Sequence, residues 1–406
     1  MAYFYRNGLL NVGEKGRHEV DIASLARKSG RPLYVYDLDN IRARFQVLNE
    51  AFAGVPHTVH YAMKANSHPG ILALFAKLGA GADTVSGGEI ERAMAAGIPA
   101  SRIIFSGVAK TGREIELALK SKIKQINVES LPELERIRDV AAKLGVTADV
   151  ALRINPDVNP VTHPYITTGF RENKFGIDES ALPQIVAILK GSPDRLRLRG
   201  LTMHIGSQLF DLAVMAEAIE KTIAVHKRLT SEGFKLDRLD IGGGLGINYE
   251  SPDETAELER LRAYGKLAVE RVKPLGVELL TEPGRVLVAR AGLLVGEVQY
   301  VKATPAKTFA ILDTGMHHLI RPALYGAKHR VVPLEEKSVP AREYDLVGPI
   351  CESSDFLAKS MMLPELSPGD FIGIADAGAY GFVMASRYNS HELPLEICVS
   401  EGLTVE

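Results

Sequence analysis

Three side chains that can do chemistry and one glycine turn each follow a short apolar run. The side chains are Lys64, His204 and Glu282, and the turn is Gly242-Gly243-Gly244. Lysine is rarely buried without a partner, so a lysine after Tyr61-Ala62-Met63 is unusual. A desolvated lysine has a lowered pKa and can form Schiff bases with carbonyl compounds. An ion-paired structural lysine is the alternative that its own neighbours leave open.

The glycine turn and Ser207 could together bind a phosphate group. Successive glycines allow backbone N–H groups to approach an anion closely, and we expect Gly243 and Gly244 to do so. Ser207, in His204-Ile205-Gly206-Ser207-Gln208, could add a hydroxyl. The turn does not have the spacing of the dinucleotide fingerprint G-x-G-x-x-G. A plain tight turn and a plain loop serine are the alternatives.

Two carboxylates and the histidine fit an aromatic cofactor with a ring nitrogen. Glu282 could form a salt bridge with Arg285, or it could face the pyridine nitrogen of pyridoxal 5′-phosphate (PLP) and keep it protonated. A protonated ring is a strong electron sink. His204 could be an ordinary polar residue or stack on such a ring. Asp83 could cap a helix or lie near Lys64 and the phenolic oxygen of the ring.

A second set of reactive side chains lies in the last third of the chain. Cys351 could be an inert buried thiol, the usual case, but its place beside Glu352 in a turn bounded by Gly and Pro favours exposure. Arg321 and Tyr325 suit the binding of a carboxylate, and Tyr380 offers an aromatic hydroxyl. His317-His318 lacks the ligand spacing of zinc sites, so we predict no metal.

The elements that must position these residues alternate between strands and helices. Eight short apolar runs, typical of strands buried on both faces, lie at 60–64, 81–85, 103–106, 125–128, 150–154, 200–204, 238–241 and 278–282. Helical patterns separate them, with apolar residues three and four positions apart, at 71–78, 115–119, 131–144, 211–230 and 255–273. Ser86 and Ser130 are placed as N-caps.

Eight alternating units predict an α/β fold, a closed (β/α)₈ TIM-like barrel, with an open doubly wound sheet as the alternative. In such a barrel, functional residues lie at the carboxyl ends of the strands, where Lys64, His204 and Glu282 fall. After residue 286 the sequence predicts strands at 294–301, 308–312, 330–334, 344–348, 371–375 and 395–399. We therefore expect a barrel at 37–285 and a β-domain formed by 1–36 and 286–406. Strand-like runs at 4–5, 9–10 and 32–36 could pair with that domain.

Composition narrows the class of protein. The 406 residues include only two cysteines, Cys351 and Cys398, and carry a net charge of −2. Nothing in this composition suggests a nucleic-acid or membrane partner. No signal-peptide pattern or long apolar run is present, so we expect a cytoplasmic protein without disulfides.

Seven motifs occur in an order that resembles a known family. They are Tyr61-Ala62-Met63-Lys64-Ala65-Asn66, Ser86-Gly87-Gly88-Glu89, His204-Ile205-Gly206-Ser207-Gln208, Gly242-Gly243-Gly244, Glu282-Pro283-Gly284-Arg285, Cys351-Glu352-Ser353 and Asp376-Ala377-Gly378-Ala379-Tyr380. Together they resemble the fold-type III PLP-dependent decarboxylases, and within these the bacterial diaminopimelate decarboxylases. The resemblance spans nearly the whole chain. Ser354 stands where the family often has glycine, and His317-His318 where it often has asparagine.

The resemblance implies roles for individual residues. Lys64 would hold PLP as a Schiff base, and Cys351 would be the catalytic proton donor. The other cofactor-binding residues would be Asp83, His204, Ser207, Gly243, Gly244, Glu282, Gly284, Arg285 and Tyr380. The substrate-binding residues would be Arg285, Arg321, Tyr325, Glu352 and Tyr380. The family also implies a Greek-key-like C-terminal β-barrel and a homodimer, with the Cys351–Glu352 segment reaching the partner's site.

The implied reaction removes CO₂ from the D-centre of meso-2,6-diaminopimelate and gives L-lysine, the last step of lysine biosynthesis. The first alternative is a decarboxylase of ornithine, lysine, arginine or carboxynorspermidine. Diaminopimelate ends in a second amino-acid head, which needs a cation and an acid, and Arg321 with Glu352 fits that need. A racemase and a non-catalytic PLP-binding protein are more remote alternatives, because Glu282 and Cys351 favour decarboxylation.

Overall fold

The chain forms two compact units in a computed structural model that describes residues 3–158, 174–401 and 403–405. The first, here the barrel unit, comprises Phe45–Gly246 and Thr255–Gly284. The second, the β-rich unit, comprises Met1–Arg44, Ile247–Glu254 and Arg285–Glu406. The expected boundaries at 37 and 285 differ from these, since 37–44 and 247–254 group with the β-rich unit.

Eight parallel strands close into a barrel in the order β10-β11-β12-β5-β6-β7-β8-β9. This confirms the predicted (β/α)₈ barrel and excludes the open sheet. Each strand contains residues of one predicted run, and most of the strand residues are buried. The bounds are β5 (His57–Ala62), β6 (Gly81–Thr84), β7 (Ile103–Phe105), β8 (Gln125–Val128), β9 (Ala148–Arg153), β10 (Leu196–Thr202), β11 (Arg238–Asp240) and β12 (Glu278–Thr281).

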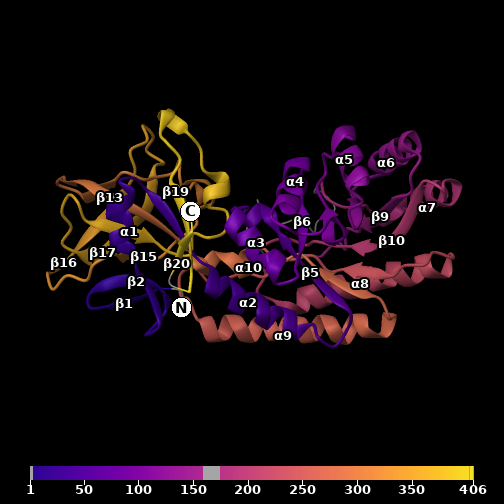
Figure 1. Ribbon diagram of the computed structural model, residues 1–406, viewed down its shortest axis with the longest axis horizontal. Coiled ribbons are helices and arrows are strands. Elements are labelled where there is room, and N and C mark those ends of the chain that lie inside the picture. Colours follow the sequence, from indigo (N-terminus) through magenta and orange to yellow (C-terminus); the bar gives the residue numbers. More distant parts are fainter. Residues whose placement is uncertain (1–2, 159–173, 402, 406) are drawn as a thin grey trace. The chain divides into compact units, whose positions relative to one another are not determined.

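Helices surround the barrel strands (Figure 1). Five were predicted, namely α3 (Pro69–Lys77), α5 (Gly112–Ser121), α6 (Leu131–Leu144), α8 (Leu212–Ser231) and α9 (Glu254–Val272). The sequence analysis did not predict α2 (Leu38–Ala51) or α7 (Leu182–Gly191), and of α4 (Gly87–Ala95) it predicted only the cap. That cap is confirmed, because the Ser86 hydroxyl accepts the Glu89 N–H at 3.2 Å. The Ser130 hydroxyl likewise accepts the Glu133 N–H at 3.4 Å.

The predicted position of Lys64 within a strand is wrong. Strand β5 ends at Ala62, and Lys64 lies in the following 3₁₀ turn η1 (Met63–Ala65). Met63 and Ala65 are buried on either side of it, while the Lys64 side chain is 35% exposed. The turn therefore fixes the backbone of Lys64 and leaves its ammonium accessible.

The β-rich unit contains two sheets. Strands β1 (Tyr3–Arg6), β2 (Leu9–Glu14) and β3 (His18–Asp21) form the smaller one, followed by helix α1 (Ile22–Ser29). The larger, nine-stranded sheet runs β17-β16-β14-β13-β4-β19-β20, with β18 bridging β13 and β15. Its strands are β4 (Leu33–Asp37), β13 (Gly292–Ala303), β14 (Thr308–Leu312), β15 (Val331–Pro333), β16 (Ala341–Val347), β17 (Phe356–Pro364), β18 (Phe371–Ile374), β19 (Leu395–Ser400) and β20 (Leu403–Val405).

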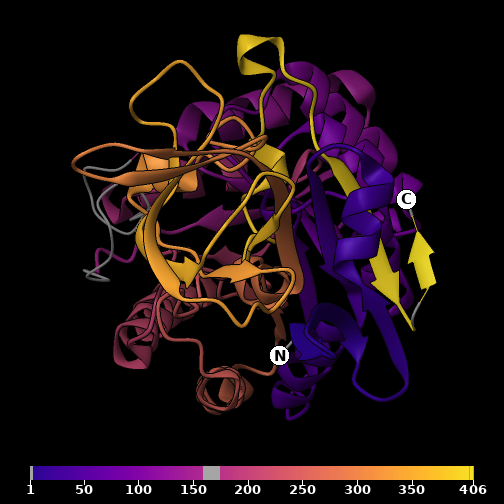
Figure 2. The same cartoon turned by 90° about the vertical axis from the view of Figure 1, so that its left-hand side faces the viewer.

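The N-terminal strand β4 lies between β13 and β19 and so ties the two ends of the chain together, as Figure 2 shows for this unit. The expected pairing of 32–36 with the C-terminal strands is confirmed. The larger sheet is mixed, because the pairs β4–β19 and β14–β16 are parallel. It is therefore not a strict Greek key, in which all strands are antiparallel. Strands β3, β17 and β20 were not predicted. Among the described residues, no helix is long and apolar enough to cross a membrane.

Candidate active site

Lys64 and Asp83 form an ion pair at the carboxyl ends of neighbouring barrel strands. The Lys64 ammonium lies 3.1 Å from Asp83 Oδ2, and the Asp83 side chain is fully buried. The turn that carries Lys64 packs against the end of β12, because a Cβ on Gly284 would lie 3.0 Å from Ala65 and 3.2 Å from Ala62. The expected proximity of Lys64 and Asp83 is thus present.

The glycine turn after β11 is packed tightly against backbone. A Cβ on Gly243 would lie 2.0 Å from the Glu282 carbonyl oxygen, and one on Gly244 would lie 2.3 Å from the Gly206 carbonyl oxygen. Gly244 also has φ +108°, where side chains are strained. Both positions therefore require glycine for packing, whatever else their N–H groups bind. Ser207 lies half-buried in the adjacent loop.

His204 is held as a neutral imidazole. The Gly243 N–H donates to its Nδ1 at 3.3 Å, so this nitrogen must carry a lone pair. Burial lowers the His204 pKa well below its usual value, and the nearby charges of Lys64 and Arg153 lower it further. The approach of Nδ1 to Glu282, at 4.0 Å, is therefore not an ion pair.

Glu282 is a buried carboxyl group among other acids. Burial raises its pKa well above the usual value, and Asp240 and Asp83 raise it further, while Lys64 and Arg153 oppose them. The Asn127 amide donates to Glu282 Oε1 at 3.4 Å. Arg285, which the sequence analysis considered as a salt-bridge partner of Glu282, donates to the Tyr249 hydroxyl at 2.8 Å.

Arg285 and Arg321 approach one aromatic ring in the β-rich unit. The Arg321 guanidinium lies 4.5 Å from the centre of the Tyr249 ring, and Arg285 lies 4.7 Å from that of Tyr380 and 5.9 Å from that of Tyr249. Both arginines are more than nine-tenths buried. Burial lowers the pKa of Arg321, and the charge of Arg285 lowers it further. Two buried cations that repel each other favour a bound anion.

His329 orients Arg321. Its Nδ1–H donates to the Ala375 carbonyl at 3.0 Å, and its Nε2 accepts from Arg321 at 2.8 Å. Burial and the adjacent Arg321 lower the His329 pKa to about 3, so the ring remains a neutral acceptor. Tyr325 ends helix α11 (Arg321–Tyr325), four residues from Arg321 and thus on the same side of the helix.

Tyr380 is presented by a strained loop after β18. Asp376 and Tyr380 have φ of 60° and 57°, a left-handed conformation that is costly for a bulky side chain. The buried Asp376 carboxylate anchors the loop through Arg290 and Arg330, each at 2.9 Å. Such strain persists where function requires one side-chain direction.

Cys351 is exposed, as predicted, in the turn after β16, and Glu352 beside it is exposed too. Asp355 holds this turn by accepting the N–H groups of Met316 and Ile350, each at 2.7 Å. Glu352 accepts hydrogen bonds from the Tyr388 and Ser354 hydroxyls, which lower its pKa. The predicted site residues thus form three clusters, around Lys64, Arg321 and Cys351.

Comparison with known proteins decides the family. Residues 38–289 match the family described as "Pyridoxal-dependent decarboxylase, pyridoxal binding domain". Diaminopimelate decarboxylase of Vibrio cholerae is 44% identical over 395 residues, covering 97% of this chain and 93% of that protein. The crystal structure of diaminopimelate decarboxylase from Helicobacter pylori complexed with L-lysine has a TM-score of 0.88 at 42% identity, with 94% of each chain covered.

This chain belongs to the diaminopimelate decarboxylase family. It is a carboxy-lyase with PLP as its cofactor. A lysine/ornithine decarboxylase from Vibrio vulnificus, complexed with putrescine, is a more distant structural relative, with a TM-score of 0.81 and 26% identity.

The residues of the barrel unit fit the cofactor that this family uses. Lys64 offers an accessible amine held by a fixed turn. One oxygen of Asp83, Oδ1, is buried without a hydrogen-bond partner. Such an orphaned acceptor is costly unless a ligand or water satisfies it. Among the described residues, no group of three His, Cys, Asp or Glu side chains is placed to hold a metal ion.

The residues of these clusters that were not predicted include Arg153, Asp240, Asn127 and Tyr249, as well as His329 and Tyr388 described above. Arg153 and Asp240 end strands β9 and β11, and Asn127 lies in β8, so the rule that selected Lys64 and Glu282 could have found them. Each is a polar residue within an apolar run. Tyr249 carried no such signal, because it lies in 247–254, which groups with the β-rich unit.

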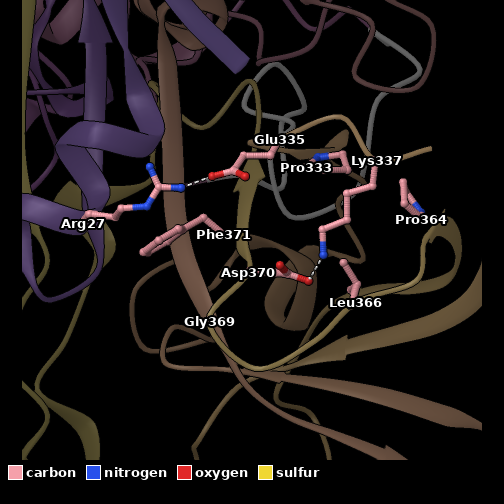
Figure 3. A pocket seen from close by; sticks show the side chains of 9 residues that line it. All are labelled: Arg27, Pro333, Glu335, Lys337, Pro364, Leu366, Gly369, Asp370 and Phe371. Atoms are coloured by element: carbon pink, nitrogen blue, oxygen red, sulfur yellow. Dashed lines mark hydrogen bonds and ion pairs between the residues drawn. The ribbon is translucent and has the colours of Figure 1, made fainter. Parts of the chain in front are cut away.

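A small pocket on the β-rich unit is lined by residues other than the predicted site residues. It has a volume of about 110 Å³ and is lined by Arg27, Pro333, Glu335, Lys337, Pro364, Leu366, Gly369, Asp370 and Phe371 (Figure 3). Its charged groups already pair with each other, Arg27 with Glu335 and Lys337 with Asp370. None of the predicted site residues lines it.

Proposed function

We propose that this chain decarboxylates meso-2,6-diaminopimelate at its D-centre, giving L-lysine and CO₂. The observation that carries this choice is the pair of buried cations, Arg285 and Arg321, on the Tyr249 ring. A substrate whose far end is a second amino-acid head brings a carboxylate that such a pair attracts. Ornithine, lysine and arginine bring a cation there, which two arginines repel.

Lys64 would hold PLP through its Nζ, and Asp83 would keep that amine in position. Ser207, Gly243, Gly244 and Gly284, with Arg285 and Tyr380, would complete the cofactor-binding set. His204 would contribute a neutral imidazole against the cofactor, and Glu282 a carboxyl group toward its ring nitrogen. When bound, PLP supplies an electron sink for the negative charge left on carbon as CO₂ departs.

The substrate's distal end is held by opposite charges. Arg285 and Arg321, with Tyr325 and Tyr380, bind the distal carboxylate, and His329 keeps the Arg321 guanidinium aimed. Glu352 binds the distal amine. Its lowered pKa, caused by the hydrogen bonds from Tyr388 and Ser354, keeps it a carboxylate at neutral pH.

Cys351 completes the reaction. The bond from the D-carbon to its carboxylate breaks, CO₂ leaves, and the Cys351 thiol gives its proton to the same carbon. Solvent then returns a proton to the exposed sulfur. General acids placed in this way contribute roughly 10²- to 10⁴-fold in rate.

The working enzyme is a homodimer in the cytoplasm, with the Cys351–Glu352 turn completing the site of the partner subunit. The exposure of both residues in a rigid turn supports this proposal. Both cysteines are free thiols, in keeping with a reducing compartment. Mixing the Lys64→Ala and Cys351→Ala variants tests the shared site: heterodimers with one intact site should regain part of the activity, whereas no regain would contradict it.

The test of the substrate is CO₂ release from meso-diaminopimelate, lysine, ornithine and arginine at equal concentrations. We expect diaminopimelate to have a kcat/KM higher by at least about 100-fold, since charge-assisted hydrogen bonds contribute roughly 1.5–3 kcal/mol each. A higher value for ornithine or lysine would identify the chain as a decarboxylase of another basic amino acid.

A further inference from the structure

A hydrogen-bonded chain of four polar side chains crosses the inside of the barrel and ends on Glu282. Arg238 Nη1 donates to Gln125 Oε1 at 3.2 Å. Gln125 Nε2 donates to Asn127 Oδ1 at 2.7 Å, and Asn127 Nδ2 donates to Glu282 Oε1 at 3.4 Å. All four residues are more than nine-tenths buried. The interior of such a barrel is ordinarily filled by branched apolar side chains, so this polar chain is unusual.

These contacts pass through the barrel interior. Gln125 and Asn127 are two positions apart in β8, so their side chains lie on the same face. Strand β8 is opposite β12 and is not adjacent to β11 in the closed barrel. Gly200 in β10 makes room for Arg238, because a Cβ there would lie 2.7 Å from Arg238 Cγ. Arg238 Nε also donates to Asp237 at 2.9 Å, which fixes the side chain. The chain therefore runs from the amino end of β11 to the carboxyl end of β12.

The orientation of both amides is set from the Arg238 end. A guanidinium has donors and no acceptor, so Gln125 must turn its carbonyl oxygen toward Arg238 and its NH₂ toward Asn127. Asn127 must then accept with its own carbonyl oxygen. Its NH₂ is thereby directed toward the Ser106 hydroxyl, at 3.0 Å, and toward Glu282. The chain thus has one direction, and Glu282 stands at its accepting end.

We propose that Arg238, Gln125 and Asn127 are positioning residues that keep Glu282 Oε1 a permanent acceptor and leave Oε2 as the oxygen that takes up or releases a proton. An oxygen that faces the N–H of a fixed donor cannot carry a proton directed at that donor, so the proton of the acid lies on the other oxygen. Oε2 is the oxygen that approaches His204, at 4.0 Å from Nδ1. The meaning of this arrangement for catalysis rests on the proposed role of Glu282 toward the PLP ring nitrogen.

Glu282 lies among several other ionisable groups, all of which stay in place in the variants used below. They come from other strands, turns and helices of the barrel unit and are Lys64, Asp83, Arg153, His204, Asp240 and Tyr264. Burial raises the Glu282 pKa well above its usual value. Without a cofactor the carboxyl group is therefore protonated at pH 5, and its carbonyl oxygen is the one that Asn127 contacts.

The first test uses the protein without PLP and does not depend on the proposed function. Gln125→Glu is isosteric and reverses the chain. A carboxylate beside Arg238 stays ionised and can only accept, so Asn127 must turn its NH₂ toward position 125 and its carbonyl oxygen toward Glu282. Infrared spectra at pH 5 give the C=O band of Glu282, identified by its loss in Glu282→Gln. We expect Gln125→Glu to move this band to higher wavenumber, because the carbonyl oxygen loses its donor. An unchanged band overturns the proposal.

The control separates the direction of the amide from the added charge. Asn127→Leu alone should raise the wavenumber of the Glu282 band, since the donor is gone. Gln125→Glu should then cause no further shift in the Asn127→Leu background. A shift of the same size in that background would come from the charge alone and overturns the proposal. If Gln125→Glu does not fold, the Asn127→Leu result decides, and an unshifted band overturns the proposal as well.

The second test uses the enzyme loaded with PLP that carries ¹⁵N in its ring, and solid-state NMR reports whether that nitrogen is protonated. We expect a protonated nitrogen in the parent. Gln125→Glu should lose at least part of this proton, because the reversed amide favours the protonated form of Glu282, and kcat/KM should fall by roughly 10-fold. The same nitrogen signal in both proteins overturns the positioning role. An unprotonated nitrogen in the parent overturns the proposed role of Glu282 and leaves the infrared result standing.

Discussion

The backbone N–H of Gly243 donates to Nδ1 of His204 at 3.3 Å and fixes that imidazole as the neutral tautomer with its proton on Nε2. The contact joins the loops after β10 and β11. It also explains why a histidine beside Glu282 can serve as a flat, uncharged surface, and it yields the first prediction.

Two substitutions of His204 should separate the contribution of its ring from that of its acceptor nitrogen. His204→Phe keeps a flat ring, and His204→Gln keeps an acceptor for Gly243. If the ring covers the cofactor, Gln should weaken PLP binding by about 10-fold, since aromatic stacking contributes roughly 0.5–1.5 kcal/mol, and Phe should weaken it less. Fluorescence titration with PLP measures both. Equal affinities of the two variants would remove the stacking role.

Arg321→Ala should raise KM for diaminopimelate by about 10- to 100-fold with a smaller effect on kcat, because a charge-assisted hydrogen bond is lost. CO₂ release from lysine, which lacks the distal carboxylate, should change little. Arg342→Ala, at an exposed arginine of the same unit, is the matched control. An unchanged KM would point to another distal anchor.

Cys351→Ala should lower kcat by roughly 100-fold or more while the cofactor absorbance stays, because only the proton donor is removed. The second cysteine provides a control within the chain. Burial raises the Cys398 pKa to about 12, so iodoacetamide at pH 8 should label Cys351 and spare Cys398. Peptide mass spectrometry identifies which cysteine is labelled. A Cys351→Ala variant that keeps the parent's kcat would exclude Cys351 as the proton donor.

Buried histidines should make the fold sensitive to acid. Burial lowers the His317 pKa to about 3, with His318 and His391 packed against its ring. The unfolded chain then binds more protons between about pH 6.5 and 3, so stability falls as the pH falls, by about 1.4 kcal/mol per pH unit for each such histidine.

His317→Asn should flatten this acid limb in urea unfolding measured from pH 7 to 4, whereas His18→Asn, at an exposed histidine, should not. If both variants follow the parent's pH dependence, His317 does not titrate as its surroundings imply.

The barrel strands could be predicted because burial on both faces leaves short apolar runs, and the carboxyl ends of those runs then identified Lys64 and Glu282. The same rule could have selected Arg153 and Asp240. The 3₁₀ turn of Lys64 could not be predicted, because three residues carry too little pattern to separate a strand end from a turn. Strand β17 was missed since its exposed Lys359 and Ser360 interrupt the apolar alternation. The place of Tyr249 could not be predicted either, because it depends on how segments distant in sequence meet, and no local sequence pattern encodes that.

The most direct test of the account is borohydride reduction of the PLP-loaded protein, followed by peptide mass spectrometry and compared with Lys64→Ala. The account predicts one pyridoxyl group, on Lys64, and a visible absorbance band that disappears in the variant. Lys110→Ala, at a buried lysine that donates to Glu133 at 2.6 Å, provides the control and should retain the adduct if it folds. A reducible adduct that persists in Lys64→Ala, or that maps to another lysine in the parent, would contradict the account.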